Sequence, residues 1–255
     1  MNAISACLIT LNEEKNLPRA LVSLKGVADE IVVVDACSSD TTIEIARQHG
    51  AVVHVRPWTN YSDQRNFAAS QAQHNWILAI DADEEVGQEL RASLLRWKLE
   101  PATGAAYEFS RRAEYLGKWM RHSGWYPDIK PRLYDRRQGK FIGVLHEKVH
   151  AEGVVGRLEG DLLHHAYGTL AAHRVKSEAY ASISAEAMFQ RGQRHWLFPL
   201  LLFPTWTLVH TLVLRAAWLD GWRGLLIAWM AARTVFRKYW KLGQRAGRIA
   251  RGETK

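Results

Sequence analysis

Residues 30–42 read EIVVVDACSSDTT, and this stretch decides the fold. Its run of branched apolar residues is typical of a strand that is buried on both faces. The run ends at Asp35, and Asp40 is suited to cap a helix over residues 40–49, which Gly50 would end. The stretch therefore predicts a buried strand followed by a helix.

The same alternation continues along the first hundred residues. Further strands are predicted over residues 3–11, 51–55 and 76–81, and further helices over residues 13–24 and 62–73. Such β-α-β-α order indicates an α/β fold, a Rossmann-like, doubly wound and mostly parallel sheet. Ligands of such sheets bind beyond the carboxyl ends of the strands.

The rest of the chain changes character twice. Residues 107–165 are rich in glycine, aromatic and basic residues and predict an antiparallel extension, with short strands near 131–134 and 147–151. Residues 169–191 predict one long helix. A shift in composition near residue 190 suggests two domains, 1–190 and 191–255.

The composition excludes several classes of protein. The 255 residues are 47% hydrophobic and 24% charged, so neither disorder nor a fibrous repeat is expected. Two cysteines, Cys7 and Cys37, give no disulfide framework or metal motif. Of the net charge of +8, residues 233–255 carry +7, so the main domain is nearly neutral and we expect no nucleic-acid binding.

Polar side chains follow three of the predicted strands. Asn12 and Glu13 follow the first strand, Asp35 ends the second, and Asp81 and Asp83 end the fourth. Alternate residues of a strand point the same way, so the last two could present two carboxylates together. Carboxylate oxygens suit Mg²⁺ or Mn²⁺, which complete their shells with phosphate oxygens. A nucleotide diphosphate is the ligand that this implies.

These motifs resemble those of a known family. Residues 5–13 (SACLITLNE), 32–42 (VVVDACSSDTT) and 80–84 (IDADE) look like the inverting family-two glycosyltransferases of the GT-A fold. Residues 131–134 (PRLY), 143–147 (GVLHE) and 163–167 (LHHAY) are most similar to bacterial lipopolysaccharide-core β-glucosyltransferases. The resemblance covers roughly residues 3–190, and it implies a hexose, with glucose expected, carried by UDP.

The resemblance implies roles for the matching positions on the donor side. Asp83 and Asp81 would bind the metal, Mg²⁺ or Mn²⁺, with His164 completing its shell, although a plain core or surface histidine is an equal alternative. The residues that would hold the nucleotide sugar are Thr10, Asn12, Glu13, Asp35, Arg65, Asp81 and Arg132.

On the acceptor side, Glu147 is the implied base that removes the hydroxyl proton, and His146 would orient it or touch the acceptor. Basic and aromatic residues over 111–125 could form a cleft for a phosphorylated glycolipid. Burial of these aromatic side chains for packing is the alternative.

The C-terminal segment predicts membrane association. Residues 196–214 contain no formal charge, and from residue 233 a cationic stripe with a spacing of four runs beside an apolar stripe. Such helices lie on anionic membranes. We expect a peripheral or monotopic protein on the cytoplasmic face of the inner membrane, with a re-entrant or two-span hairpin as the alternative.

The expected function is transfer of a sugar to a lipid-linked acceptor, either the lipopolysaccharide core or, as the alternative, a polyprenyl phosphate. Two other functions are compared with it. A sugar nucleotidyltransferase would need a basic, glycine-rich loop where Asn12, Glu13 and Glu14 stand. A non-catalytic membrane scaffold is disfavoured by the intact Asp81 and Asp83 pair. The sequence leaves the oligomeric state open.

Overall fold

The computed structural model describes the backbone of residues 1–143 and 147–250, and the side chains up to residue 247. These residues divide into two compact units. One, the sheet unit, contains residues 1–112 and 127–165, and the other, the helical unit, contains residues 113–126 and the chain from residue 166 onward.

The predicted parallel strands form one side of the sheet unit in the order β3-β2-β1-β4. Thr10 of β1 is aligned with Asp35 of β2, and Ile9 with Asp81 of β4, so the carboxyl ends of these strands reach one edge. The strands are β1 (Ile4–Thr10), β2 (Glu30–Asp35), β3 (Val52–Val55) and β4 (Trp76–Asp81).

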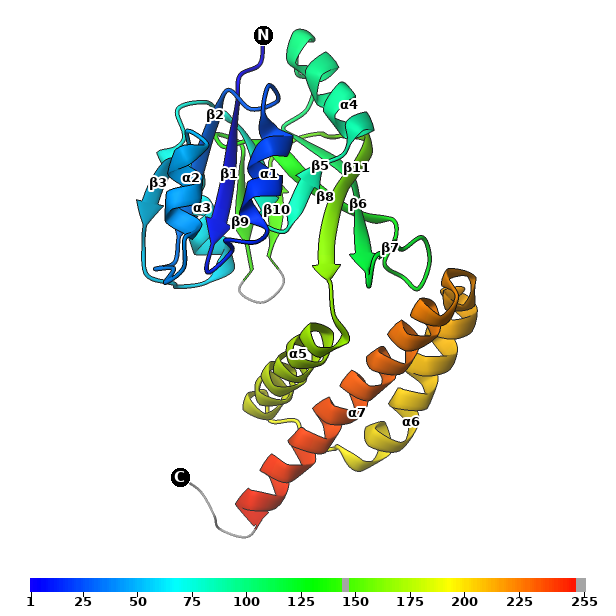
Figure 1. Cartoon of the computed structure of the whole chain (residues 1–255). Helices are drawn as coiled ribbons and strands as arrows, with labels where there is room; N and C mark the ends of the chain where they lie inside the picture. The colour runs from blue at the N-terminus through cyan, green and yellow to red at the C-terminus, as the bar shows by residue number, and fades with distance from the viewer. Residues whose placement is uncertain (144–146, 251–255) are drawn as a thin grey trace. The chain divides into compact units, whose positions relative to one another are not determined.

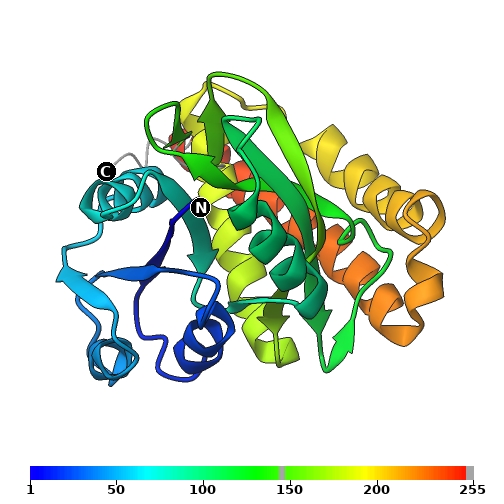
Figure 2. The same cartoon turned by 90° about the horizontal axis from the view of Figure 1, so that it is seen from above.

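Helices cover both faces of these strands (Figures 1 and 2). Leu8 of β1 packs in one cluster with α1 (Leu17–Leu24) and α2 (Thr42–Gln48), whereas Cys7 packs in another with α3 (Tyr61–Gln71). Since neighbouring strand residues point to opposite faces, both faces of β1 are buried. The doubly wound arrangement is confirmed.

Most of the remaining strands of the sheet pair in antiparallel fashion, as expected for the extension over residues 107–165: β8 with β4 and β6, and β11 with β5. The neighbours β6 and β11 run in the same direction, since the Ala105 amide donates to the Val154 carbonyl at one end and the Leu116 amide to the Tyr167 carbonyl at the other. The order of the sheet continues as β8-β6-β11-β5, and β9 and β10 form a separate hairpin. The elements are β5 (Glu84–Val86), α4 (Gln88–Leu99), β6 (Ala106–Tyr115), β7 (Lys118–Trp119), β8 (Asp128–Asp135), β9 (Gly139–Ile142), β10 (Lys148–Ala151) and β11 (Val155–Tyr167).

The helical unit is built from three long helices. They are α5 (Leu170–Gln190), α6 (Leu197–Val209) and α7 (Trp222–Ala250), with a π-helical turn (His210–Leu214) and a 3-10 turn (Ala217–Asp220) between the last two. Figure 1 shows α6 and α7 side by side. The long helix over 169–191 is confirmed, but it packs with the C-terminal helices, so the division differs from the predicted boundary near residue 190.

The cationic stripe of α7 faces acidic residues of α5. Glu178 of α5 accepts hydrogen bonds from Arg237 at 2.7 Å and pairs with Lys241 at 2.8 Å, and Glu186 accepts from Arg245 at 2.7 Å. The stripe is paired in this way because two acidic residues, eight positions apart on α5, lie on one helix face and match its spacing. Binding of the stripe to an anionic membrane stays a prediction.

Asp220 and Arg223, which would be costly to bury in a bilayer, are satisfied within the helical unit. The buried Asp220 carboxylate accepts from the His122 amide at 3.0 Å and from Ser123 Oγ at 2.9 Å. Arg223 donates to the Leu116 carbonyl at 2.8 and 3.0 Å. The α6–α7 turn is thereby clamped to the loop that contains residues 116–123.

Candidate functional site

The carboxylate of Asp35, at the end of β2, is fully buried and bound by its own chain. Its oxygens accept hydrogen bonds from Thr10 Oγ1 at 2.7 Å, from Ser38 Oγ at 2.6 Å and from the Ser38 amide at 2.6 Å. Asp35, held by Thr10, thus fixes the start of the loop after β2 at Ser38. They do not present free polar atoms at the edge of the sheet.

Asn12 and Glu13 lie nearer to solvent, on the loop after β1. Asn12 adopts a left-handed backbone with φ of 55°, which asparagine tolerates better than most residues. Its Oδ1 accepts from the Ser39 amide at 2.9 Å, and the Glu13 amide donates to Thr42 Oγ1 at 2.8 Å. The two loops at this edge are therefore joined through the predicted nucleoside residues.

Asp81, at the end of β4, lies between two arginines from distant parts of the chain. Arg65 of α3 forms a short ion pair with its Oδ1, and Arg132 of β8 lies 3.3 Å from its Oδ2. Burial alone would raise the pKa of the Asp81 carboxyl, but the two guanidinium groups outweigh it and hold this pKa well below its usual range. Asp81 is therefore ionised at neutral pH.

Glu84 and Arg111 extend this cluster. The Glu84 carboxylate is fully buried, accepts the Asp81 amide at 2.9 Å, and lies 3.4 Å from Arg132 and 3.2 Å from Arg111. Arg111 also pairs with Asp128, its register partner on β8, at 2.7 Å. The result is an alternating network of three arginines and three carboxylates.

Arg65 has hydrogen-bonding capacity left over. Its side chain is 4% exposed, and its Nε and Nη1 find no hydrogen-bond partner among the residues that the structure describes. The guanidinium lies over the Phe141 ring, 5.1 Å from its centroid. Buried donors without partners are costly, so this arginine is suited to receive an anionic ligand.

Asp83 and His164 are adjacent. Asp83 Oδ2 lies 3.2 Å from His164 Nε2. Two ligands in neighbouring positions of an octahedral Mg²⁺ shell, each about 2.1 Å from the ion, lie about 3.0 Å apart, so this pair fits one divalent cation. Across residues 1–143 and 147–247, however, no three His, Cys, Asp or Glu side chains gather, and Asp81 is occupied by arginines. The predicted trio is only partly brought together.

The register of β5 and β11 holds this pair in place. His164 of β11 is aligned with Glu84 of β5, next to Asp83. A side chain at Gly160, whose φ is 93°, would lie 2.2 Å from the Leu90 amide, so only glycine fits where β11 passes the start of α4. The position of His164 therefore depends on the pairing of β11 with β5 and on the close contact at Gly160.

The candidate base lies beside the same cluster. Glu147 Oε1 is 3.9 Å from Arg65 Nη2, and its side chain is partly exposed. His146, the residue predicted to orient it, lies outside the described residues. The network therefore joins Glu147 to the donor-side residues across three segments of chain.

Tyr115, in the segment predicted to form the acceptor cleft, packs within the helical unit. Tyr115 is fully buried, donates to or accepts from His173 Nδ1 at 2.9 Å, and contacts Trp125 and Tyr167 edge to face. Burial lowers the pKa of His173 to about 4, so it is neutral at pH 7. Packing therefore accounts for Tyr115, and the acceptor cleft over residues 111–125 stays a prediction.

A comparison with protein families identifies the family of the chain. The model described as "Glycosyl transferase family 2" matches residues 5–199. The chain belongs to glycosyl transferase family 2. The predicted α/β fold with a GT-A-like sheet is thereby confirmed, and the match contains every candidate site residue.

Several curated family-2 relatives align over nearly the whole chain. An uncharacterised glycosyltransferase of Rickettsia felis is 30% identical over 263 residues, which cover 95% of this chain and 90% of the relative. The lipopolysaccharide core biosynthesis glycosyltransferase LpsC of Rhizobium meliloti is 28% identical over 256 residues, 97% of this chain and 94% of the relative.

Solved structures resemble the family-2 chain more distantly. Staphylococcus aureus TarS (residues 1–349) is 16% identical with a TM-score of 0.48, over 98% of this chain and 92% of that chain. The glucosyl-3-phosphoglycerate synthase of Mycobacterium tuberculosis, in complex with Mn²⁺ and UDP, is 24% identical with a TM-score of 0.30, over 32% of this chain and 34% of that chain.

Three members of the arginine–carboxylate network were missed by sequence reasoning. Glu84 stood in the quoted IDADE motif without a role, Arg111 was assigned to the acceptor, and Asp128 was not singled out. The motif could have marked Glu84, because it directly follows two carboxylates. The cross-strand pair of Arg111 and Asp128 depends on a register that no local pattern encodes.

Proposed function

We propose that this family-2 enzyme is a metal-dependent, inverting hexosyltransferase that uses a UDP-sugar, with glucose the expected sugar, and a lipid-linked acceptor. The observation that carries the proposal is the placement of Asp83 and His164 beside three arginines at the carboxyl edge of the sheet. A nucleotide diphosphate is the ligand whose charges and metal preference match that set.

The donor would lie across this edge. Asn12 and Glu13, on the loop joined to residues 38–42, would contact the nucleoside. Arg65 would meet the diphosphate through its Nε and Nη1, which have no hydrogen-bond partner among the described residues. Arginine suits phosphate because its planar donors match two oxygens. Arg132 would then hold Asp81 in place while Arg65 exchanges partners.

Asp83 and His164 would hold Mg²⁺ or Mn²⁺, with phosphate oxygens completing the shell. When bound, the ion would neutralise charge that develops on the leaving diphosphate. Asp81 would join the metal shell only if Arg65 or Arg132 released it. The proposal therefore assigns Asp81 first to ordering the arginines and second to the metal.

Glu147 would act as the general base. Its carboxylate would take the proton of the acceptor hydroxyl as the new oxygen–carbon bond forms and the bond from the anomeric carbon to the diphosphate breaks on the opposite sugar face. Arg65, 3.9 Å away, would keep the carboxylate ionised and oriented. His146 remains a proposed partner of this base.

The proposed acceptor is the lipopolysaccharide inner core, and the proposed location is the cytoplasmic face of the inner membrane. The name of the LpsC relative and the exposed apolar surface of the helical unit support this choice. Among the described residues, one helical stretch, Leu197–Leu214, is long and apolar enough to cross a bilayer. A polyprenyl-phosphate acceptor is the alternative.

A screen of nucleotide sugars tests the proposal. Purified full chain is incubated with each UDP- or ADP-activated hexose, Mn²⁺ or Mg²⁺ and core glycolipid, and diphosphate release and the lipid product are both measured. Asp83→Ala should abolish turnover without loss of fold, whereas Glu159→Gln, exposed in the same unit, should not affect it. Folded protein that transfers no sugar under any of these conditions would refute the proposal.

A further inference from the structure

The outward side of α6 and its π-helical turn is an apolar stripe, here called the outer stripe. Its members are 47–69% exposed and recur once per helical turn, with two neighbours in the second turn, so they share one helix face. They are Phe198, Leu201, Leu202, Trp206, Val209 and Val213. The opposite side of α6 is covered, because Leu200 packs against Ala185, Tyr239 and Leu242.

A lipid bilayer is the partner that matches the chemistry of this stripe. Residues 197–214 contain no Asp, Glu, Lys or Arg, whereas protein interfaces carry a polar and charged rim. Exposed tryptophans stand on the stripe at Trp206 and beside its end at Trp218 and Trp222. Tryptophan is enriched where a protein meets lipid headgroups, since its ring is apolar and its N–H is polar.

The stripe lies along the membrane surface and does not cross it. At the start of α6, Leu200 packs at the level of Ala185, next to which Glu186 pairs with Arg245. A spanning α6 would carry this ion pair into hydrocarbon. At the other end, the turn is clamped to residues 121–123 through Asp220. Charged groups are thus held beside both ends of α6, on the side that packs against α5 and α7, so only the outer side of α6 can enter lipid.

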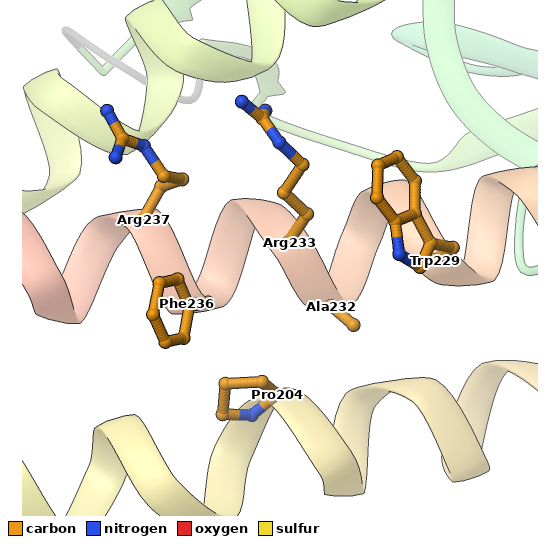
Figure 3. Close-up of a pocket in the computed structure, with 6 residues that line it drawn as sticks. All are labelled: Pro204, Trp229, Ala232, Arg233, Phe236 and Arg237. Carbon is orange, nitrogen blue, oxygen red and sulfur yellow. The ribbon is translucent and has the colours of Figure 1, made fainter.

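The cationic stripe of α7 takes little part in this contact. Arg237 and Lys241 are paired with Glu178, and Arg233 lies 3.9 Å from the same carboxylate. Figure 3 shows the guanidinium groups of Arg233 and Arg237 on the side of α7 away from Pro204 of α6. Pro204 and Phe236 line a pocket of about 450 Å³ between the two helices, which offers a lipid chain further apolar surface.

We propose that the helical unit binds bilayers by inserting the outer stripe of α6 into the interface, and that this binding does not require anionic lipid. The inference refines the membrane location given under the proposed function. Its observations do not involve the transferase site, and either could fail alone.

Vesicle flotation of the full chain tests the inference. Binding is compared between vesicles of phosphatidylcholine alone and vesicles with added phosphatidylglycerol, at matched salt. Four free basic residues near the surface would favour the anionic vesicles by roughly 1,000-fold. We expect clear binding to the neutral vesicles and a preference for the anionic ones below about 100-fold. Binding to anionic vesicles alone, or a preference near 1,000-fold, would overturn the inference.

Matched variants identify the surface. Leu201→Ser with Trp206→Ser should weaken binding to neutral vesicles about 30-fold or more, from the apolar area lost. The control, Leu99→Ser with Trp58→Ser, changes the same residue types at exposed positions of the sheet unit and should leave flotation unchanged. Equal effects of the two pairs, or stripe-dependent dimers in sedimentation without vesicle binding, would contradict lipid as the partner.

A second variant separates the roles of charge. Glu178→Gln with Glu186→Gln would release the basic residues of α7, so we expect the preference for anionic vesicles to rise at least about tenfold, while neutral binding stays unchanged. An unchanged preference would mean that the cationic stripe of α7 already faces lipid in the wild type, which would contradict the inference. Diphosphate release from a soluble UDP-sugar is recorded in parallel, and loss of flotation with intact release leaves the proposed function standing.

Discussion

Replacing Glu178 by glutamine should loosen α5 from α7 in a measurable and pH-dependent way. Hydrogen bonds from Arg237 and Lys241 lower the pKa of Glu178 from its ordinary 4.5 to about 2. A shift of this size corresponds to about 3 kcal/mol at most. Since 31% of the side chain is exposed, solvent screening reduces the expected contribution to about 1 kcal/mol.

Amide hydrogen exchange read by mass spectrometry is the suitable assay, because it reports each helix separately. A loss of about 1 kcal/mol should speed exchange in α5 and the facing part of α7 about fivefold at pH 7. Glu186→Gln removes only the more exposed pair with Arg245, and should speed exchange no more than about twofold. Peptides of the sheet unit serve as internal standards.

The pH dependence has a definite sign. Between pH 4.5 and 2 the unfolded state holds a proton on Glu178 that the folded state lacks, so folding weakens as pH falls through this window. The contribution is fully present above about pH 4.5. The difference between wild type and Glu178→Gln should therefore be constant from pH 7 to 5 and shrink below 4.5. Equal exchange in the two proteins at pH 7 and low salt would refute the reasoning.

Three further changes give expected outcomes at other sites. Glu84→Gln should cost about 3–5 kcal/mol, since it leaves Arg111 and Arg132 short of a buried counter-charge, and calorimetry should show a fall in Tm of roughly 6–20 °C. Glu85→Gln, at the partly exposed neighbour that pairs with Arg19, is the comparison, and an equal fall there would contradict the network. Asp220→Asn should speed amide exchange over residues 116–126, by an amount that corresponds to a loss of about 1–3 kcal/mol in protection. Exchange at the wild-type rate would show that the contacts of Asp220 with residues 121–123 do not stabilise this loop. Asp83→Ala should abolish Mn²⁺ binding in the presence of UDP, measured by titration calorimetry, while circular dichroism stays unchanged; retained affinity would remove Asp83 from the metal site.

The parallel half of the fold was predictable because each of its strands is marked by a local pattern in the sequence. The run before Asp35 and the run before Asp81 are both apolar and short, and their ends meet at one edge as expected. Their side chains behave differently, however. Asp81 pairs with arginines at the edge of the sheet, whereas the Asp35 carboxylate accepts its hydrogen bonds from Thr10 and Ser38. No sequence pattern distinguishes a carboxylate that pairs with distant arginines from one bound by its own loop.

Long-range pairing explains what was not predicted. The spacing of Arg237, Lys241 and Arg245 showed that they share a helix face, but periodicity does not reveal what a face meets. Glu178 and Glu186 lie 59 residues earlier and decide it. The same holds for Arg111, whose partner Asp128 is set by strand register. Local pattern determines elements and faces, and tertiary contacts determine partners.

The register of β5 against β11 restricts how family-2 chains of this kind can change length. Because alternate strand residues face opposite ways, a single-residue deletion that slips β11 past β5 would turn His164 away from Asp83. A slip of β11 in either direction would also place a residue with a side chain against the Leu90 amide, where only glycine fits. Natural length variation should therefore collect in the loops before β11 and not within the strand.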